Sequence, residues 1–82
     1  MRIETVLIRV LAELERAEKL HPDWPRNPIH AGAVVAEEAG ELIQAALNAD
    51  EKKASRHLMM TEAVHTAAMA LRFLKNFDDE EQ

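Results

Sequence analysis

The 82-residue sequence contains no cysteine. This absence excludes disulfides, a thiolate metal site and a cysteine nucleophile, and it is compatible with a reducing cytosol. No apolar run approaches 18 residues, so we expect no transmembrane helix. The first residues carry mixed charges, unlike a signal peptide. The sequence therefore predicts a cytoplasmic chain with no membrane contact.

Glycine and proline are also scarce, with two and three residues, and tyrosine is absent. The hydrophobic share of 48% is rich in alanine and leucine, which is typical of an all-α chain. A formal net charge of −5 argues against nonspecific nucleic-acid binding, and no nucleic-acid partner is expected. The whole chain, residues 1–82, makes a single small domain whose thin core favours oligomerisation.

The first of three predicted helices runs from about residue 3 to residue 20. Its apolar residues recur at steps of three and four: Ile3, Val6, Leu7, Val10, Leu11 and Leu14. The opposite face carries mixed charges, and we expect Arg9 to pair with Glu13 and Glu15 with Lys19. This pattern predicts a helix with one face on the core and one in solvent.

A loop at 21–27 separates the first helix from the second. Asn27 is a good N-cap and Pro28 a good first helical residue, so a helix is predicted from Pro28 to Ala46 or Leu47. Residues 48–50 are expected to form the next turn.

The third predicted helix runs from about Glu51 to Asn76, with Asp50 as its cap. From Leu58 to Leu74 it is apolar almost all round, and such a helix is stable only when it is buried on every side. Two short helices cannot surround it, so we expect a homo-oligomer with a four-helix-bundle-type architecture. Residues 78–82 are expected to be a frayed acidic tail.

Lysine and arginine are absent between Arg26 and Lys52, where one helical turn carries Glu37, Glu38 and Glu41. Like charges four residues apart destabilise a helix by a few tenths of a kcal/mol. No basic residue of the same helix neutralises these carboxylates, which suggests that a metal or another helix supplies a cation. Hard oxygen ligands favour Mg²⁺, Mn²⁺ or Ca²⁺.

The third helix carries Glu62 and His65, which are three residues apart and therefore project from one face. If the second and third helices are antiparallel, Glu38, Glu41 and these two residues can surround one cation. His30 lies on the same side of the second helix as the glutamates, about two turns earlier, and can reach a ligand of the metal.

Simpler interpretations remain open for each of these residues. The glutamates of the second helix can be a solvated face, and His65 can be a core or interface histidine. Trp24 can be a lid over the core, or an aromatic ring that stacks on a base. A buried carboxylate at Glu62 needs a partner, and an arginine can fill that role without a metal. The sequence offers three such arginines: Arg9, Arg56 and Arg72.

The two acidic groups together resemble the motif of the MazG-like all-α nucleoside triphosphate pyrophosphohydrolases. The first half of that motif is two adjacent glutamates, two residues and a third glutamate, which Glu37, Glu38 and Glu41 match. The second half is Glu-x-x-Asp after a helix-turn-helix spacer. Here it begins at Glu62, but His65 replaces the aspartate. The resemblance extends from about Trp24 to Phe73.

The resemblance implies a Mg²⁺-dependent hydrolase that splits a nucleoside triphosphate into monophosphate and pyrophosphate. Glu38, Glu41, Glu62 and His65 would hold the metal. Glu37, beside Glu38, would bind a second metal or orient the attacking water. Substrate contacts are expected from aromatic, imidazole and basic side chains: Trp24, His30, Arg56, Arg72 and Lys75. Members of the family are dimers or tetramers, which agrees with the apolar third helix.

His65 leaves the activity open. Neutral imidazole is a poor ligand for Mg²⁺ and a better one for Mn²⁺. The substitution is consistent with a hydrolase of altered metal preference, with a weak hydrolase, or with a non-catalytic helical module that binds nucleotide or another protein. A purely structural oligomer, whose glutamates pair with arginines, is a further alternative.

Overall fold

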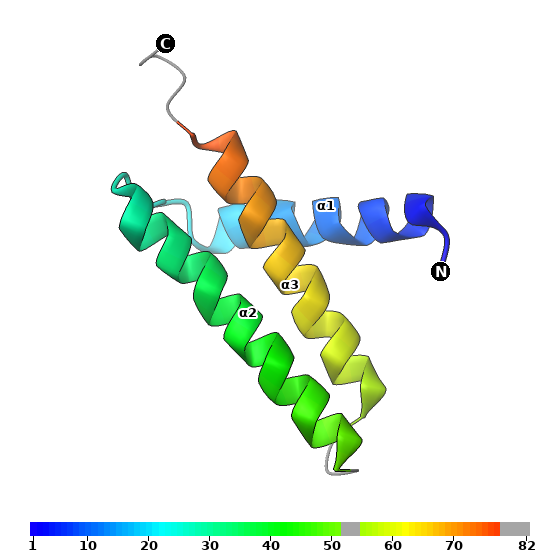
Figure 1. Ribbon diagram of the computed structural model, residues 1–82. Coiled ribbons are helices and arrows are strands. Elements are labelled where there is room, and N and C mark those ends of the chain that lie inside the picture. The colour runs from blue at the N-terminus through cyan, green and yellow to red at the C-terminus, as the bar shows by residue number, and fades with distance from the viewer. Residues whose placement is uncertain (52–54, 78–82) are drawn as a thin grey trace.

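The computed structural model describes residues 1–51 and 55–77, and this part of the chain is helical with no strand. Helix α1 spans Ile3–Leu20, α2 spans Pro28–Asp50 and α3 spans Arg56–Lys75. Helices α2 and α3 lie side by side and antiparallel, and α1 crosses α3 on one side of this hairpin (Figure 1). The predicted all-α class with three helices is therefore confirmed.

The starts of the first two helices agree with the sequence signals. Helix α1 has the predicted bounds, and its Glu15–Lys19 ion pair forms at 3.1 Å. At the start of α2 the Asn27 side chain accepts a hydrogen bond from the Ile29 N–H at 2.8 Å, and Pro28 occupies the first turn. Asn27 thus satisfies a backbone donor that a helix N-terminus otherwise leaves without a partner.

The predicted end of the second helix at residue 46 or 47 is wrong, because α2 continues to Asp50. The expected turn at residues 48–50 contains neither glycine nor proline to stop the helix. The Gln44 amide donates to Asn48 Oδ1 at 3.1 Å, one turn along the helix surface. The Asn48 side chain is therefore used along the helix and does not start a turn.

The predicted start of the third helix at Glu51, capped by Asp50, is also wrong. The Glu51 N–H donates to the Leu47 carbonyl, so Glu51 completes the last turn of α2. Helix α3 begins at Arg56, and Ser55 is its cap, with Oγ accepting from the Leu58 N–H at 3.4 Å. Residues 52–54, and the tail at 78–82 that was expected to fray, lie outside the described residues.

The core is thin and contains mostly small side chains. Its buried apolar residues are Val10, Ala17, Ala31, Ala45, Ala68 and Met69. The apolar stripe predicted for α1 is divided, because Val10 is buried whereas Ile3, Leu7 and Leu11 are each at least half exposed. No helix in the described ranges has the length and apolarity needed to cross a membrane.

One buried arginine connects α3 to the loop between α1 and α2. Arg72 is only 4% exposed, and its Nη2 donates to the carbonyl oxygens of His21 and Asp23. Its guanidinium stacks over the Trp24 ring, with 4.8 Å between Cζ and the ring centroid. Charge-assisted hydrogen bonds and a cation–π contact together allow a buried cation without a carboxylate.

Candidate metal centre

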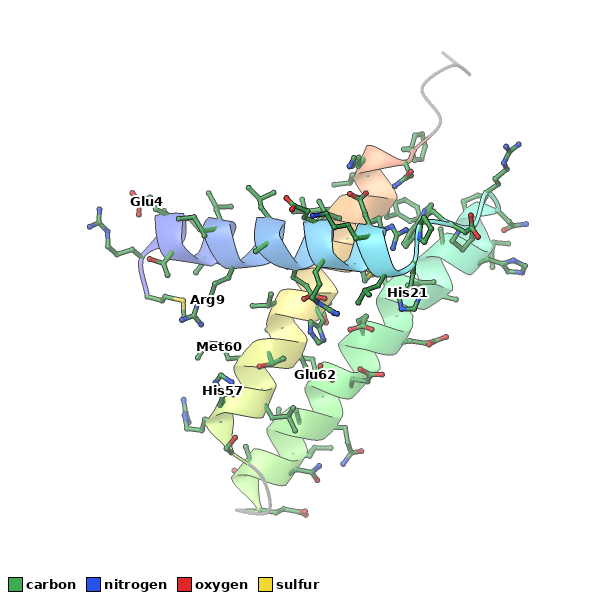
Figure 2. All side chains as sticks on the ribbon, turned by 180° about the vertical axis from the view of Figure 1, so that it is seen from behind. Glu4, Arg9, His21, His57, Met60 and Glu62 are labelled. Carbon is green, nitrogen blue, oxygen red and sulfur yellow. The ribbon has the colours of Figure 1, made fainter. Side chains whose placement is uncertain are left out.

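Carboxylates from α2 and α3 converge on one histidine at the interface of these helices. His65 Nδ1 lies 2.9 Å from Glu62 Oε1 and 3.6 Å from Glu38 Oε2. Glu38, Glu62 and His65 each offer a ligand atom, and these atoms lie within 4.8 Å of one another. Figure 2 shows Glu62 on the side of α3 that faces α2. The predicted i, i+3 pair on α3 thus meets a glutamate of α2.

The cluster contains an unsatisfied buried oxygen. Glu38 Oε2 is inaccessible to solvent and has no hydrogen-bond partner, since His65 Nδ1 at 3.6 Å is too distant. The Glu62 side chain is 14% exposed and the Glu38 side chain 24%. A carboxylate oxygen removed from water destabilises the fold unless another group binds it. A cation between these side chains would satisfy it.

The donor set is chemically suited to a divalent ion. Two carboxylates supply hard oxygen ligands, and one imidazole supplies a nitrogen of intermediate softness. This combination fits Mn²⁺ better than Mg²⁺, which is bound mainly by oxygen. The residues therefore fit a divalent metal, as the sequence predicts. The histidine shifts the expected preference from Mg²⁺ toward ions that accept a nitrogen ligand, such as Mn²⁺.

Glu41, one turn after Glu38 on α2, is electrostatically part of the same cluster. A hydrogen bond with the Glu62 carboxyl, followed by repulsion from Glu38, raises the pKa of Glu41 above its ordinary value. Crowded carboxylates raise one another's pKa in this way because their charges repel at short distance. Glu41 is exposed, so it can approach a cation from the solvent side of the cluster.

Glu13 on α1 is an additional member of the site that the sequence interpretation missed. Its Oε2 lies 3.6 Å from His65 Nε2, on the opposite side of the ring from Glu62. Arg16 binds both oxygens of Glu13 at 2.8 and 2.7 Å, and this hydrogen bonding lowers the pKa of the Glu13 carboxyl despite its partial burial. The predicted Arg9–Glu13 pair is therefore wrong.

The sequence interpretation missed Glu13 because its role depends on how α1 crosses α3. Glu13 borders the apolar stripe of α1, beside Leu14, and this position was the one available signal of partial burial. Spacing along α1 does not specify which residue of α3 it will face. Arg16 lies three residues after Glu13 and captures its carboxylate, whereas Arg9 extends toward α3.

The positions of the ring nitrogens suggest how His65 can change its role. Nδ1 is placed to donate a proton to Glu62. To bind a metal, Nδ1 must lose that proton, and the neutral ring then carries its proton on Nε2. Nε2 faces Glu13, which can accept this proton in a hydrogen bond. Metal-binding histidines are commonly oriented by a carboxylate in this manner.

Two of the other predicted residues on α2 lie apart from the convergent group. Glu37 is exposed on the solvent side of α2, next to Glu38 in sequence. His30 is exposed in the first turn, eight residues and therefore about 12 Å along the helix axis from Glu38. Neither is among the residues whose ligand atoms converge.

The remaining predicted substrate contacts lie on or near α3. Arg56 is its first residue and is exposed. Arg72 and Trp24 bind one another about two turns beyond His65. Lys75 pairs with Glu18 of α1 at 2.9 Å. Arg72, Trp24 and Lys75 therefore already contact other side chains of the same chain.

Comparisons with known proteins do not extend the sequence resemblance. The chain matches no protein-family model, and no curated protein or solved structure is significantly similar to it. The assignment of function therefore depends on the residues of the cluster and on their geometry.

Proposed function

We propose that this protein is a divalent-metal-dependent nucleoside triphosphate pyrophosphohydrolase, with a metal site formed by Glu38, Glu62 and His65. The observation that carries the proposal is the convergence of these three side chains within 4.8 Å, together with the buried, unpartnered Oε2 of Glu38. The reaction is suggested by the resemblance of Glu37, Glu38, Glu41 and Glu62 to the motif of the MazG-like pyrophosphohydrolases.

Each side chain has a definable task in this proposal. Glu38 and Glu62 hold the cation from opposite helices, and Glu41 adds a carboxylate at the exposed edge of the cluster. Glu37, exposed beside Glu38, is free to orient a water molecule or to bind a second ion. A bound divalent ion would offset phosphate charge and promote attack of water at the α-phosphorus.

The histidine favours Mn²⁺ over Mg²⁺ in this proposal. Replacing a carboxylate by a neutral imidazole removes one negative charge from the site and provides a nitrogen ligand. Glu13 does not replace the lost charge, because Arg16 binds both of its oxygens, but it lies 3.6 Å from His65 Nε2 and can orient the ring. We therefore propose Mn²⁺ as the preferred ion and Mg²⁺ as a weaker substitute.

The second candidate function is a non-catalytic helical module that binds nucleotide. The same histidine is the observation that favours it, since Glu62 already engages the ring at 2.9 Å from Nδ1. The arginine-paired scaffold is less well supported. Among the described residues, Glu62 contacts His65, while Arg72 binds loop carbonyls and Arg9 contacts Met60.

The two candidates are separated by pyrophosphate release from a panel of ribo- and deoxyribonucleoside triphosphates, each with Mn²⁺ and with Mg²⁺. The hydrolase should release pyrophosphate with at least one nucleotide, faster with Mn²⁺, and Glu38→Gln should abolish the release. Glu15→Gln is a matched control, because Glu15 is an exposed glutamate paired with Lys19. Nucleotide binding without release, from folded protein, would support the non-catalytic module instead.

The proposed enzyme is a homo-oligomer, and α2 carries the surface for it. Six exposed residues follow alternate steps of four and three along its outer face: Ile29, Ala33, Ala36, Gly40, Ile43 and Leu47. This outer stripe has the spacing of a heptad seam, which pairs one helix with another. A Cβ at Gly40 would meet no atom within 4 Å in the same chain, so a partner backbone can approach closely there.

The charges at the ends of α2 favour an antiparallel partner of the same kind. Arg26 and His30 lie at its start, and Asp50 ends it. Antiparallel pairing of two α2 helices would place Arg26 of one copy near Asp50 of the other and oppose the two helix dipoles favourably. Two α2–α3 hairpins joined in this way make a four-helix bundle, the architecture expected from the sequence.

Light scattering after size exclusion tests this assembly. The wild type should have at least twice the chain mass of 9.3 kDa, and Ile43→Glu should reduce it to the monomer mass. Ile8→Glu is the matched control, because Ile8 is 69% exposed but lies on α1, outside the outer stripe. A wild type that is monomeric at micromolar concentration would rule out the seam.

A further inference from the structure

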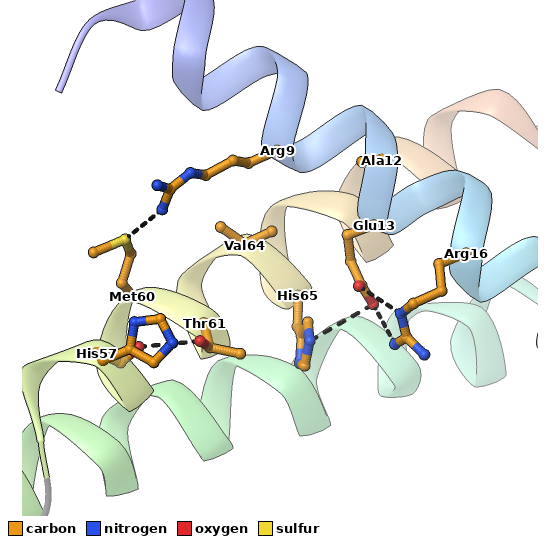
Figure 3. A pocket seen from close by; sticks show the side chains of 9 residues that line it. All are labelled: Arg9, Ala12, Glu13, Arg16, His57, Met60, Thr61, Val64 and His65. Atoms are coloured by element: carbon orange, nitrogen blue, oxygen red, sulfur yellow. Dashed lines mark hydrogen bonds and ion pairs between the residues drawn. The ribbon is translucent and has the colours of Figure 1, made fainter.

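A pocket of about 330 Å³ lies between α1 and α3, adjacent to the proposed metal site. Its lining residues come from both helices and are shown in Figure 3: Arg9, Ala12, Glu13, Arg16, His57, Met60, Thr61, Val64 and His65. The volume is within the range of small-molecule sites. Two of the lining residues, Glu13 and His65, also belong to the carboxylate–histidine group, so the pocket and the metal site share a wall.

The pocket is locally cationic in a chain with a net charge of −5. Arg9 and Arg16 line it, against the single carboxylate of Glu13. Arg16 neutralises that carboxylate with two hydrogen bonds. The charge of Arg9 therefore remains available to an incoming anion.

Arg9 is bound by a weak partner. Its Nη1 donates to the thioether sulfur of Met60 at 2.9 Å, across the pocket from α1 to α3 (Figures 2 and 3). A thioether is a poor acceptor that carries no charge. By contrast, Lys19 and Lys75 each bind a carboxylate at about 3 Å. A phosphate oxygen would replace Met60 as the Arg9 acceptor with a net gain, because both partners would then be charged.

The neighbouring groups identify the kind of anion. A cation at Glu38 and Glu62 would lie on one side of His65, and the guanidinium of Arg9 lies on the pocket side. A chain of phosphate groups needs such an arrangement, since its oxygens can bind a metal at one position and an arginine at the next.

We propose that the pocket between α1 and α3 binds the phosphate chain of a di- or triphosphate, with Arg9 as the principal contact and Arg16 at its margin. The identity of this ligand rests on the proposed function, which supplies the metal side of the site. In this proposal two arginines of α1 contact the phosphates, whereas the sequence predicted such contacts from Arg56, Arg72 and Lys75 on α3.

Titration calorimetry with inorganic pyrophosphate in the presence of EDTA tests the pocket without the metal. The wild type should bind pyrophosphate, and Arg9→Gln should weaken the binding by about tenfold, as the loss of one charge-assisted hydrogen bond does. Arg2→Gln is the matched control, because Arg2 is a highly exposed arginine near the start of α1, paired with Glu4. Equal weakening by both variants would overturn the proposal.

Methyl NMR provides a second measurement that does not depend on affinity. Pyrophosphate should shift the methyl resonance of Met60 as Arg9 leaves the sulfur, while the buried Met69 methyl stays in place. Addition of adenosine, which has no phosphate, should leave Met60 unchanged. An unchanged Met60 resonance at saturating pyrophosphate would contradict the proposed site.

The outcomes also separate the pocket from the proposed function. If Arg9→Gln weakens pyrophosphate binding but the wild type binds no divalent ion, the pocket is retained and the metal-dependent hydrolase is wrong. If Glu38→Gln abolishes ion binding while Arg9→Gln leaves pyrophosphate binding unchanged, the metal site is retained and the pocket proposal is wrong.

Discussion

Two charged regions lie about two turns apart on α3, and they are stabilised in opposite ways. At one, the buried cation of Arg72 is bound by two loop carbonyls and the ring of Trp24. At the other, Glu38 and Glu62 approach one histidine, and an oxygen of Glu38 has no partner. Arg72 Nε also lacks a hydrogen-bond partner, but loop carbonyls and the Trp24 ring bind the rest of the guanidinium. Among the described residues, no donor binds the Glu38 oxygen, so we expect the second region to take a cation.

This difference separates a structural charge from a functional one. A buried charge that is bound mainly by groups of the chain contributes to the fold, and its removal is costly whatever is added to the solution. A group of carboxylates with an unmet hydrogen bond destabilises the fold until a cation arrives. Stability with and without metal therefore distinguishes the two regions.

The largest effect is expected at Arg72. Arg72→Leu should lower the free energy of unfolding by about 2–3 kcal/mol, because charge-assisted hydrogen bonds to the loop and the stacking on Trp24 are lost. Urea denaturation should show the same loss with and without Mn²⁺. Arg56→Leu, at an exposed arginine of the same helix, is the control and should have little effect. Rescue of Arg72→Leu by Mn²⁺ would contradict the structural role.

Glu13 tests whether the metal region extends to α1. Glu13→Gln should weaken Mn²⁺ binding by roughly tenfold, as removal of a carboxylate that orients a metal-binding histidine does. Glu15→Gln, on the solvent face of α1, should leave the affinity unchanged. Equal Mn²⁺ affinities of Glu13→Gln and wild type by calorimetry would remove Glu13 from the site.

His65 sets the metal preference in this account. His65→Asp restores the aspartate of the motif and should raise the affinity for Mg²⁺ relative to Mn²⁺, because an oxygen ligand replaces nitrogen. Competition between the two ions, followed by the electron paramagnetic resonance of free Mn²⁺, measures this ratio. An unchanged ratio would mean that residue 65 does not contact the ion.

The smallest effect concerns Glu41, whose pKa is raised by Glu62 and then by Glu38. An acid with a raised pKa in the folded state binds its proton more tightly there, so stability falls as pH rises above its ordinary value of 4.5. Glu41→Gln should therefore slightly raise the melting temperature of the metal-free protein at pH 7. The gain should vanish below pH 4.5, where both side chains are neutral.

Glu37→Gln is the control for this pH dependence, as a neighbouring exposed glutamate on the same helix. A gain that is independent of pH would show that the amide acts through helix propensity and not through charge. Added Mn²⁺ should reverse the order of the two melting temperatures, because the wild-type carboxylate then has a cation to bind.

Local sequence signals predicted the elements but not all of their ends. The Asn27–Pro28 pair specified the start of α2, because capping depends on residues that are adjacent in sequence. The end of α2 was not predictable in the same way, since no glycine or proline marks it and Asn48 bonds along the helix. Helix boundaries without such residues depend on packing.

The residues of the site show the same difference between contacts that local spacing predicts and contacts that depend on packing. The meeting of Glu38, Glu62 and His65 follows from i, i+3 spacing and an antiparallel hairpin, both of which the sequence supports. The positions of Glu13 and Arg9 depend on how α1 crosses α3, and no spacing within one helix contains that information. The role of Arg72 was hidden for the same reason, because its partners lie in a loop 49 and 51 residues away.

Calorimetric titration of Mn²⁺ into the metal-free wild type and Glu62→Gln tests the central claim most directly. We expect saturable binding to the wild type and a loss of at least tenfold in Glu62→Gln, whose glutamine cannot supply a charged ligand. Indistinguishable titrations of two folded proteins, or no binding to the wild type, would contradict a metal site at this cluster.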